Sequence, residues 1–394
     1  MFLSWSIYAL YYLCRVHYSI AIPIINYELG LSHCYLGLIA SGFFITYGLG
    51  QLVIGYLSFK YRPEVLLLIG VAGSSLMSIV FGLSSDFMLF LVIWTVNGFF
   101  QSMGWPTLVK IVSGLSRKSE MGLTFGLFNT SWALGHMISW LFSGYIISIL
   151  SWRACFLING LIFWVLGGIS CLKLIKYSGR MGLNENWKLK KSFPRFSDLK
   201  LSMLSLFSIA YFIADAVRYG LITYLPSFIY SIEKSAFNTA LISMILPLIG
   251  SIGMVFTGLL IDKFPRRFEL PFLSILITLS MLFVKLFPTV YVEHKAMGVI
   301  VLAIMSFLLY GIESQLSSTI PIKIIGTEHS SIIAGVINCV GAFGAFVINA
   351  LSGFMIDEFG FNFVFSFWSI IQLIEIIVLI VIYIALNLKS SLYS

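Results

Sequence analysis

Twelve apolar segments dominate this sequence, and each is long enough to cross the roughly 30 Å hydrocarbon core of a bilayer as a helix. Hydrophobic residues make up 59% of the 394 residues and charged residues only 10%, a composition that excludes a soluble globular protein. We therefore expect an all-α membrane protein with twelve transmembrane helices. The predicted spans are 3–26, 36–58, 65–83, 87–112, 121–148, 153–176, 200–230, 236–261, 270–287, 297–322, 331–353 and 363–387.

The basic residues between these spans predict the orientation of the chain. Lys and Arg collect in the loops after the even-numbered spans, at Lys60, Arg62, Arg117, Lys118, Arg180, Lys188, Lys190, Lys191, Arg195, Lys263, Arg266 and Arg267. By the positive-inside rule, these loops and both termini lie in the cytoplasm. The formal net charge of +8 then reflects topology and contact with anionic membrane lipids, and it indicates no nucleic-acid partner.

An internal repeat predicts two halves. Arg15, Pro23 and Gly55 recur 203 residues later as Arg218, Pro226 and Gly258, and the GLFN sequence at 126–129 recurs 209 residues later as GVIN at 335–338. We expect two pseudo-symmetric six-helix halves, 1–176 and 200–394, joined by a cytoplasmic linker at 177–199. Parallel halves of this kind are typical of transporters with a substrate site near the membrane midplane.

Two arginines lie inside the predicted spans, and they mark the candidate substrate site. Arg15 and Arg218 are each followed eight residues later by a proline. A guanidinium does not lose its proton, and its insertion at the centre of a membrane helix costs about 3 kcal/mol on insertion scales. A function that repays this cost is the binding of an anion.

The loop sequence GLLIDKFPRR at 258–267 resembles the loop motif of the major facilitator superfamily. In that family the acid and the following basic residues latch helices on the cytoplasmic face, a role that the resemblance assigns to Asp262, Lys263, Arg266 and Arg267. The first copy of the motif, GYLSFKYRPE at 55–64, departs from the pattern, with Phe59 in place of the acid.

The sequence YYLCRVHYSIAIP at 11–23 is similar to the first span of the organophosphate:phosphate antiporters, the glycerol-3-phosphate and hexose-phosphate transporters. The similarity continues in FFQSMGWPTLVKIV at 99–112 and RYG at 218–220. It implies the major facilitator fold and a secondary transporter that exchanges an organophosphate for inorganic phosphate by alternating access. Family distribution and short loops favour a bacterial inner membrane, and we expect a monomer.

The resemblance also implies a set of substrate-binding residues. Arg15 and Arg218, one from each half, would grip one phosphoryl group, because a phosphate dianion needs about two cations with forked donors. Repulsion between the two arginines would stall an empty carrier and so make exchange obligatory. Hydroxyls that match family positions near the site are those of Tyr8, Tyr12, Tyr47 and Tyr310. For each tyrosine, packing or interfacial anchoring is the alternative.

Departures from the family pattern bear on the substrate. Val16 and Gln51 replace two lysines, so two positive charges are missing. The fifth-span signature retains Asn129 and Gly135, while His136 either substitutes for the family histidine or packs between helices. By their positions in the family pattern, Gln51, Asn129 and His136 are also assigned to the substrate-binding residues. Asp215 and Glu313 are acids within spans, and they serve either as proton carriers or as ion-pair partners, with Asp215 three residues before Arg218 on one helix face.

Two other functions stay open beside antiport. One is a proton-coupled symporter of another organic anion, and the other is a sugar-phosphate sensor that does not transport. We expect no enzyme activity, cofactor or metal, since the sequence has no nucleophile–base grouping, nucleotide loop or metal-ligand spacing. Lys110 and Lys323, at the ends of the fourth and tenth spans, are attributed to snorkelling and excluded from the site.

Overall fold

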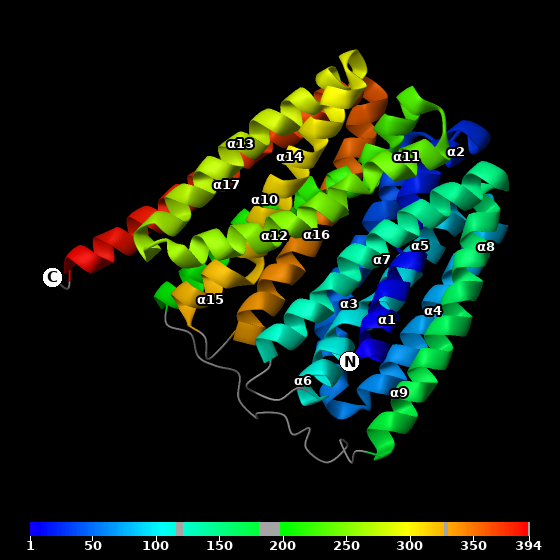
Figure 1. Cartoon of the computed structure of the whole chain (residues 1–394), viewed down its shortest axis with the longest axis horizontal. Coiled ribbons are helices and arrows are strands. Elements are labelled where there is room, and N and C mark those ends of the chain that lie inside the picture. Colours follow the sequence, from blue (N-terminus) through cyan, green and yellow to red (C-terminus); the bar gives the residue numbers. More distant parts are fainter. Residues whose placement is uncertain (116–120, 181–197, 327–329, 393–394) are drawn as a thin grey trace. The chain divides into compact units, whose positions relative to one another are not determined.

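The computed structural model describes residues 1–115, 121–180, 198–326 and 330–392, and these residues form helices without a β-strand. Eleven helical segments among them are long and apolar enough to cross a membrane. The remaining predicted span, the first in the chain, corresponds to the interrupted helical segment at 2–29 (Figure 1). The basic residues Arg117, Lys118, Lys188, Lys190, Lys191 and Arg195 and most of the predicted linker lie outside the described residues.

The chain divides into two compact units. Unit 1 consists of Met1–Ser192 with Ile222–Pro247, and unit 2 of Phe193–Leu221 with Leu248–Ser394. The long helix α10 crosses this division at its residue 221, and α12 crosses it near its start. The segment 222–247 therefore packs with the N-terminal half of the chain.

The helices of unit 1 surround the first predicted span. They are α1 (Phe2–Tyr11), α2 (His17–Leu29), α3 (His33–Lys60), α4 (Pro63–Leu83), α5 (Phe87–Ser102), α6 (Gly104–Leu115), α7 (Met121–Ile149), α8 (Trp152–Ile162), α9 (Gly168–Arg180) and α11 (Ala236–Ser243). A π-helical turn, Phe163–Gly167, joins α8 to α9. Helix α11 packs on α7, where Gly144 leaves room for the Ala236 carbonyl.

The helices of unit 2 continue the chain to its C-terminal end. They are the first part of α10 (Asp198–Glu233), then α12 (Ile245–Lys263), α13 (Arg266–Glu293), α14 (Lys295–Ser314), α15 (Ile320–Ile325), α16 (Ser330–Phe359) and α17 (Phe361–Leu392). A π-helical turn, Gln315–Thr319, joins α14 to α15. Helices α13, α14 and α17 pack together, and a buried aliphatic cluster fills the interior of the unit.

Local sequence explains where several helices begin and end. Ser32, Asp86 and Ser151 precede α3, α5 and α8, and each side chain accepts a hydrogen bond from the backbone N–H three residues on. Gly30 after α2 and Gly360 after α16 have φ of 66° and 78°, the left-handed region that glycine adopts without strain.

Glycine also sets the closest helix contacts in both units. A Cβ at Gly98 of α5 would lie 2.2 Å from the Phe43 carbonyl oxygen of α3, and one at Gly253 of α12 would lie 2.1 Å from the Phe307 carbonyl oxygen of α14. The second and fourth spans of each half are thus packed backbone against backbone. Small residues at such contacts are typical of membrane helices.

The first span differs from its prediction as one continuous helix over 3–26. Helix α1 ends at Tyr11, a 3₁₀ turn covers Tyr12–Cys14, and α2 begins at His17. Arg15 lies in the break, with φ −122° and ψ −59°. Pro23 lies inside α2 and not at the interruption.

Candidate functional site

The break in the first span leaves backbone carbonyl groups without helical partners, and side chains of α5 bind them. The Asn97 amide donates to the Cys14 carbonyl at 3.0 Å. The Gln101 amide donates to the Tyr11 carbonyl at 3.1 Å and to the Cys14 carbonyl at 3.3 Å. In a bilayer such groups must be satisfied within the protein, so these two amides make the interruption tolerable.

Ser74 of α4 hydrogen-bonds to both of these amide side chains. Its hydroxyl donates to the Asn97 side-chain oxygen at 2.7 Å and accepts from the Gln101 amide at 2.8 Å. All three side chains are buried. A buried polar network with its members bonded to one another specifies one geometry, and here that geometry is the backbone immediately before Arg15.

Helix α7 holds the other side of the break. The Ser139 hydroxyl donates to the Tyr12 carbonyl at 2.9 Å, and the Trp140 indole N–H donates to the Val16 carbonyl at 3.0 Å. The two neighbours of Arg15 are therefore bound by different helices of unit 1: Cys14 by α5 and Val16 by α7. This arrangement fixes where the Arg15 side chain begins.

The Arg15 guanidinium lies in aromatic surroundings. Its Nη1 donates to the Tyr47 hydroxyl at 3.1 Å, and its central carbon is 4.2 Å from the centre of the Tyr47 ring, 5.5 Å from that of Tyr12 and 5.7 Å from that of Phe43. The residue is 8% exposed. Cation–π contacts of this kind stabilise a buried cation without neutralising its charge.

Further aromatic side chains extend this wall along α1 and α7. Tyr8 packs edge-on against Tyr12, with ring centres 5.7 Å apart, and also against Phe128. His136 stacks on Tyr12 at 5.7 Å and packs edge-on against Trp140 at 4.3 Å. His136 is thus in contact with a side chain that touches Arg15.

The other two unit 1 residues assigned by resemblance are more accessible. Gln51 lies one turn after Tyr47 on α3 and is half-buried, whereas Asn129 on α7 is exposed. Asn129 precedes His136 by seven residues, which places both on one side of α7.

Arg218 of unit 2 has carboxylate partners. Its Nη2 lies 2.5 Å from the Asp215 carboxylate and 3.7 Å from that of Glu313, and its Nε also donates to Asp215, at 3.1 Å. The Tyr211 hydroxyl donates to Glu313 at 2.9 Å. The pairing of Asp215 with Arg218 is the ion-pair alternative that the spacing of three predicts, and Glu313 joins it from α14.

The repeat shows how the two arginine sites differ. A shift of 203 residues relates Tyr8 to Tyr211 and Arg15 to Arg218, but it relates Tyr12 to Asp215. An aromatic ring therefore lies beside the first arginine where a carboxylate lies beside the second. Gly341 of α16 allows a close approach here, because a Cβ at this position would be 2.8 Å from the Asp215 carboxylate.

In unit 2 the ring of Tyr310, on α14, occupies the space that corresponds to Tyr47 of α3 in unit 1. The same shift relates Tyr47 to Gly250, and a Cβ at Gly250 would lie 2.6 Å from the Tyr310 ring. Arg218 lies 5.7 Å from the centre of that ring. Each arginine thus contacts a tyrosine ring from another span, Tyr47 of the second span in unit 1 and Tyr310 of the fourth span in unit 2. Arg218 also lies 4.4 Å from the centre of the neighbouring Tyr219 ring.

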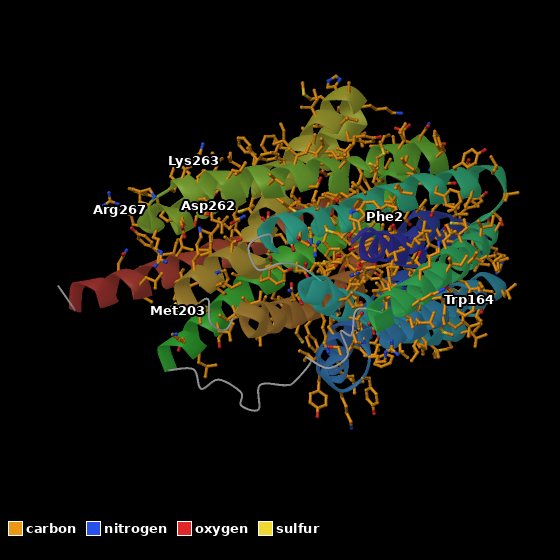
Figure 2. The ribbon with its side chains drawn as sticks, turned by 60° about the horizontal axis from the view of Figure 1, so that its bottom comes forward. Phe2, Trp164, Met203, Asp262, Lys263 and Arg267 are labelled. Atoms are coloured by element: carbon orange, nitrogen blue, oxygen red, sulfur yellow. The ribbon has the colours of Figure 1, made fainter. Side chains whose placement is uncertain are left out.

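Asp262, the acid of the predicted cytoplasmic latch, has a basic partner from outside the loop motif. Asp262 pairs with Lys323 of α15 at 2.8 Å, and Lys323 also lies 3.4 Å from the buried carboxylate of Glu269. Lys263 at the end of α12 and Arg267 at the start of α13 lie near Asp262 (Figure 2), and Arg266, the first residue of α13, is exposed. Within the described part of the chain, none of these three basic residues forms an ion pair.

Lys110 and Lys323 were predicted to snorkel to the membrane interface, but both bind groups on neighbouring helices. Lys323 joins three helices through Asp262 and Glu269. Lys110 is buried, and its ammonium group donates to the Ser58 carbonyl at the end of α3. Both lysines therefore fix helix ends within their own units.

Several residues of these sites have no counterpart in the prediction. Asn97 and Gln101 fall four residues apart in an apolar span, and Tyr211 falls four residues before Asp215, so each pair shares a helix face. Polar residues repeated at this spacing within a membrane span are the signal that identifies them. Among the described residues, no group of three or more His, Cys, Asp or Glu side chains could hold a metal ion.

The sequence matches a known protein family and is similar to several known proteins. Residues 4–349 match the family described as Major Facilitator Superfamily. Over 184 residues the chain is 32% identical to a probable hexose phosphate transport protein of Chlamydia trachomatis, a match that covers 47% of this chain and 40% of that protein. Over 179 residues it is 30% identical to the membrane sensor protein UhpC of Escherichia coli, covering 45% of this chain and 41% of the sensor. These two matches span less than half of either relative.

A longer match covers nearly the whole chain. The chain is 24% identical over 415 aligned positions to a glycerol-3-phosphate transporter of Bacillus subtilis, covering 98% of this chain and 90% of that protein. Among solved structures, a bacterial homologue of the lysosomal transporter Spinster superposes with a TM-score of 0.73 at 16% identity, over 99% of this chain and 96% of that one. At this identity the superposition supports the fold alone.

Proposed function

Because this chain belongs to the Major Facilitator Superfamily, we propose that it is a multi-pass membrane transporter that exchanges an organophosphate for inorganic phosphate by alternating access. The observation that carries the proposal is Arg15, placed in an interrupted first span among tyrosines that can donate hydroxyls to phosphate oxygens. The resemblance to phosphate-ester transporters over 98% of the chain supports the substrate class.

The two arginines would divide the work of binding. Arg15, which lies among the rings of Tyr12 and Tyr47, would bind the phosphoryl group with its guanidinium. Arg218 would exchange its carboxylate partners, Asp215 and Glu313, for phosphate oxygens when the substrate arrives. Release would restore the ion pairs, so the empty site of unit 2 is not left as a lone buried cation. The Tyr310 ring would orient Arg218 throughout.

The test is phosphate flux in sealed proteoliposomes that contain the purified protein. Uptake of radiolabelled inorganic phosphate is measured into vesicles loaded with phosphate, glycerol 3-phosphate, glucose 6-phosphate or sulfate. Antiport predicts uptake only into vesicles that hold phosphate or a phosphate ester. Equal uptake into sulfate-loaded vesicles would contradict exchange.

Proton-coupled symport is the second candidate, and the charge of the binding groups favours it. Arg15 and Arg218 contribute two positive charges, and ionised Asp215 and Glu313 contribute two negative charges. A dianion would then bind more readily if one acid took up a proton. An inwardly directed pH gradient would drive this uptake into unloaded vesicles, and an uncoupler would abolish it, whereas antiport requires internal phosphate.

A sensor is the third candidate, since one relative is a membrane sensor protein. Binding of a sugar phosphate to the purified protein without flux under any of these conditions would favour this function. From the charge distribution of the loops we propose that both termini lie in the cytoplasm. Family distribution and the short loops support a bacterial inner membrane.

A further inference from the structure

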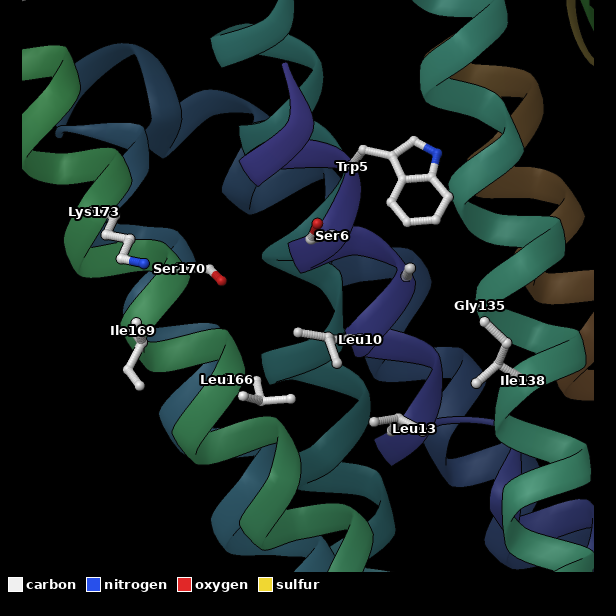
Figure 3. A pocket seen from close by; sticks show the side chains of 11 residues that line it. Trp5, Ser6, Leu10, Leu13, Gly135, Ile138, Leu166, Ile169, Ser170 and Lys173 are labelled. Atoms are coloured by element: carbon white, nitrogen blue, oxygen red, sulfur yellow. The ribbon is translucent and has the colours of Figure 1, made fainter.

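We propose that a groove on unit 1 binds one anionic phospholipid. The groove has a volume of about 420 Å³ and lies between α1, α7 and the segment from the π-helical turn into α9. Its apolar length is lined by Leu10, Leu13, Ile138, Leu166 and Ile169 (Figure 3). This proposal is independent of the transported substrate.

Three of these five apolar side chains belong to the outer face of the unit, while Leu13 is buried and forms the floor of the groove. Ile138 and Leu166 are each 50% exposed, and Ile169 is 47% exposed, although all three lie on spanning helices. In a membrane, such exposed side chains face lipid. The groove therefore opens toward the acyl chains of the bilayer.

One end of the groove is polar and positively charged. Lys173 and Ser170 lie one turn apart on α9, and Figure 3 shows them with Ser6 of α1 at the end opposite Leu13 and Ile138. Within the described residues, Lys173 forms no ion pair or hydrogen bond. An ammonium and two hydroxyls are donors that suit a phosphodiester, while the acyl chain would follow the apolar length.

The position of the Lys173 end of the groove favours a lipid with an anionic headgroup. Lys173 lies four residues before the end of its span at Tyr177, on the side where basic loop residues collect. That side is the cytoplasmic one by the positive-inside rule, and anionic lipids are attracted to basic residues there. Trp5 also lines this end, and its indole donates to Thr130, the amphipathic placement typical of an interfacial tryptophan.

Fluorescence quenching with brominated lipids tests the proposal, because Trp5 lies at the polar end of the groove. The full-length protein is placed in phosphatidylcholine vesicles that contain either brominated phosphatidylglycerol or brominated phosphatidylcholine. We expect stronger quenching by the phosphatidylglycerol probe, with the selective part absent from Trp5→Phe. Lys173→Gln should lower the relative affinity for this probe about fivefold, as one basic residue near a membrane contributes.

Lys176→Gln is the matched control, because Lys176 is an exposed lysine one turn along α9 that does not line the groove. It should leave the selectivity unchanged. Equal quenching by the two probes in the unmodified protein would overturn the proposal. An equal loss in Lys176→Gln and Lys173→Gln would also overturn it, since the selectivity would then arise from general attraction to a basic surface.

Discussion

The side-chain amide of Gln101 donates to the backbone carbonyl of Tyr11 at 3.1 Å, and this bond joins α5 to the last residue of helix α1 before Arg15. With Asn97 it satisfies carbonyls that the interrupted helix leaves without partners. The direction of the Arg15 side chain therefore depends on residues more than eighty positions away in the sequence.

Gln101→Leu should weaken substrate binding as well as stability. The change removes the side-chain donor to the Tyr11 carbonyl and one of the two donors to the Cys14 carbonyl, which costs about 1–3 kcal/mol, and it frees the turn that carries Arg15. We expect a lower Tm and a raised KM for phosphate in the proteoliposome assay. Gln372→Leu is the control, because Gln372 donates to Ser280 between α13 and α17. It should lower the Tm with an unchanged KM, and a KM raised equally by both changes would contradict the role given to Gln101.

Asp215→Asn should tighten anion binding. The change removes one negative charge beside Arg218, and two unit charges about 5 Å apart repel by about 3 kcal/mol at an effective dielectric of about 20. The Kd for inorganic phosphate should fall at least about tenfold, measured by titration calorimetry in detergent. Turnover should slow, because release would no longer be aided by the returning carboxylate. Weaker binding in Asp215→Asn would show that Asp215 orients Arg218 and does not compete with the substrate.

Lys323→Ala should destabilise unit 2, whereas Asp262→Ala should have little effect. Removing Lys323 leaves the buried Glu269 without its cation, but the Asp262 side chain is 66% exposed, and exposed ion pairs contribute about 0–1 kcal/mol. Thermal unfolding followed by intrinsic fluorescence measures both. The double variant Lys323→Ala with Glu269→Gln should recover part of the lost Tm. Absence of recovery would show that Glu269 is not the group left uncompensated.

Glu375→Met should raise the Tm. Glu375 is fully buried in α17, and among the described residues neither of its carboxylate oxygens has a hydrogen-bond partner. A buried carboxyl without partners costs free energy that an apolar side chain of similar size does not. The same thermal measurement applies, with Gln372→Leu, one turn earlier, lowering the Tm as the comparison. A Tm lowered by Glu375→Met would indicate a partner that binds this carboxyl group.

Span positions and the repeat could be predicted because both are written in the sequence as hydropathy and recurring residues. The interruption of the first span could not, because 12–16 contains neither glycine nor proline. Its cause is tertiary: Asn97, Gln101, Ser139 and Trp140 each bind a carbonyl near the break. The only local signal, Pro23, fell inside a helix.

The partners of Arg218 were predictable in part. The spacing of three from Asp215 indicates a shared helix face, and the pair is present. Glu313 is 95 residues further along the chain than Arg218, so its place beside the arginine follows from the packing of α14. The contacts of Lys323 could not be predicted. Hydropathy places this lysine at a membrane interface, but its acidic neighbours, Asp262 and Glu269, come from other helices.

Exchange of labelled inorganic phosphate in proteoliposomes of Arg15→Ala and Arg218→Ala tests the central claim most directly. Arg153→Ala is the matched control, because Arg153 lies at the very start of its span and binds backbone carbonyls at the α4–α5 turn. Loss of charge-assisted bonds to phosphate should lower exchange at least about tenfold in each of the first two variants. Exchange in the control should stay near that of the unmodified protein. Exchange at the unmodified rate in a folded Arg15→Ala or Arg218→Ala protein would contradict the account.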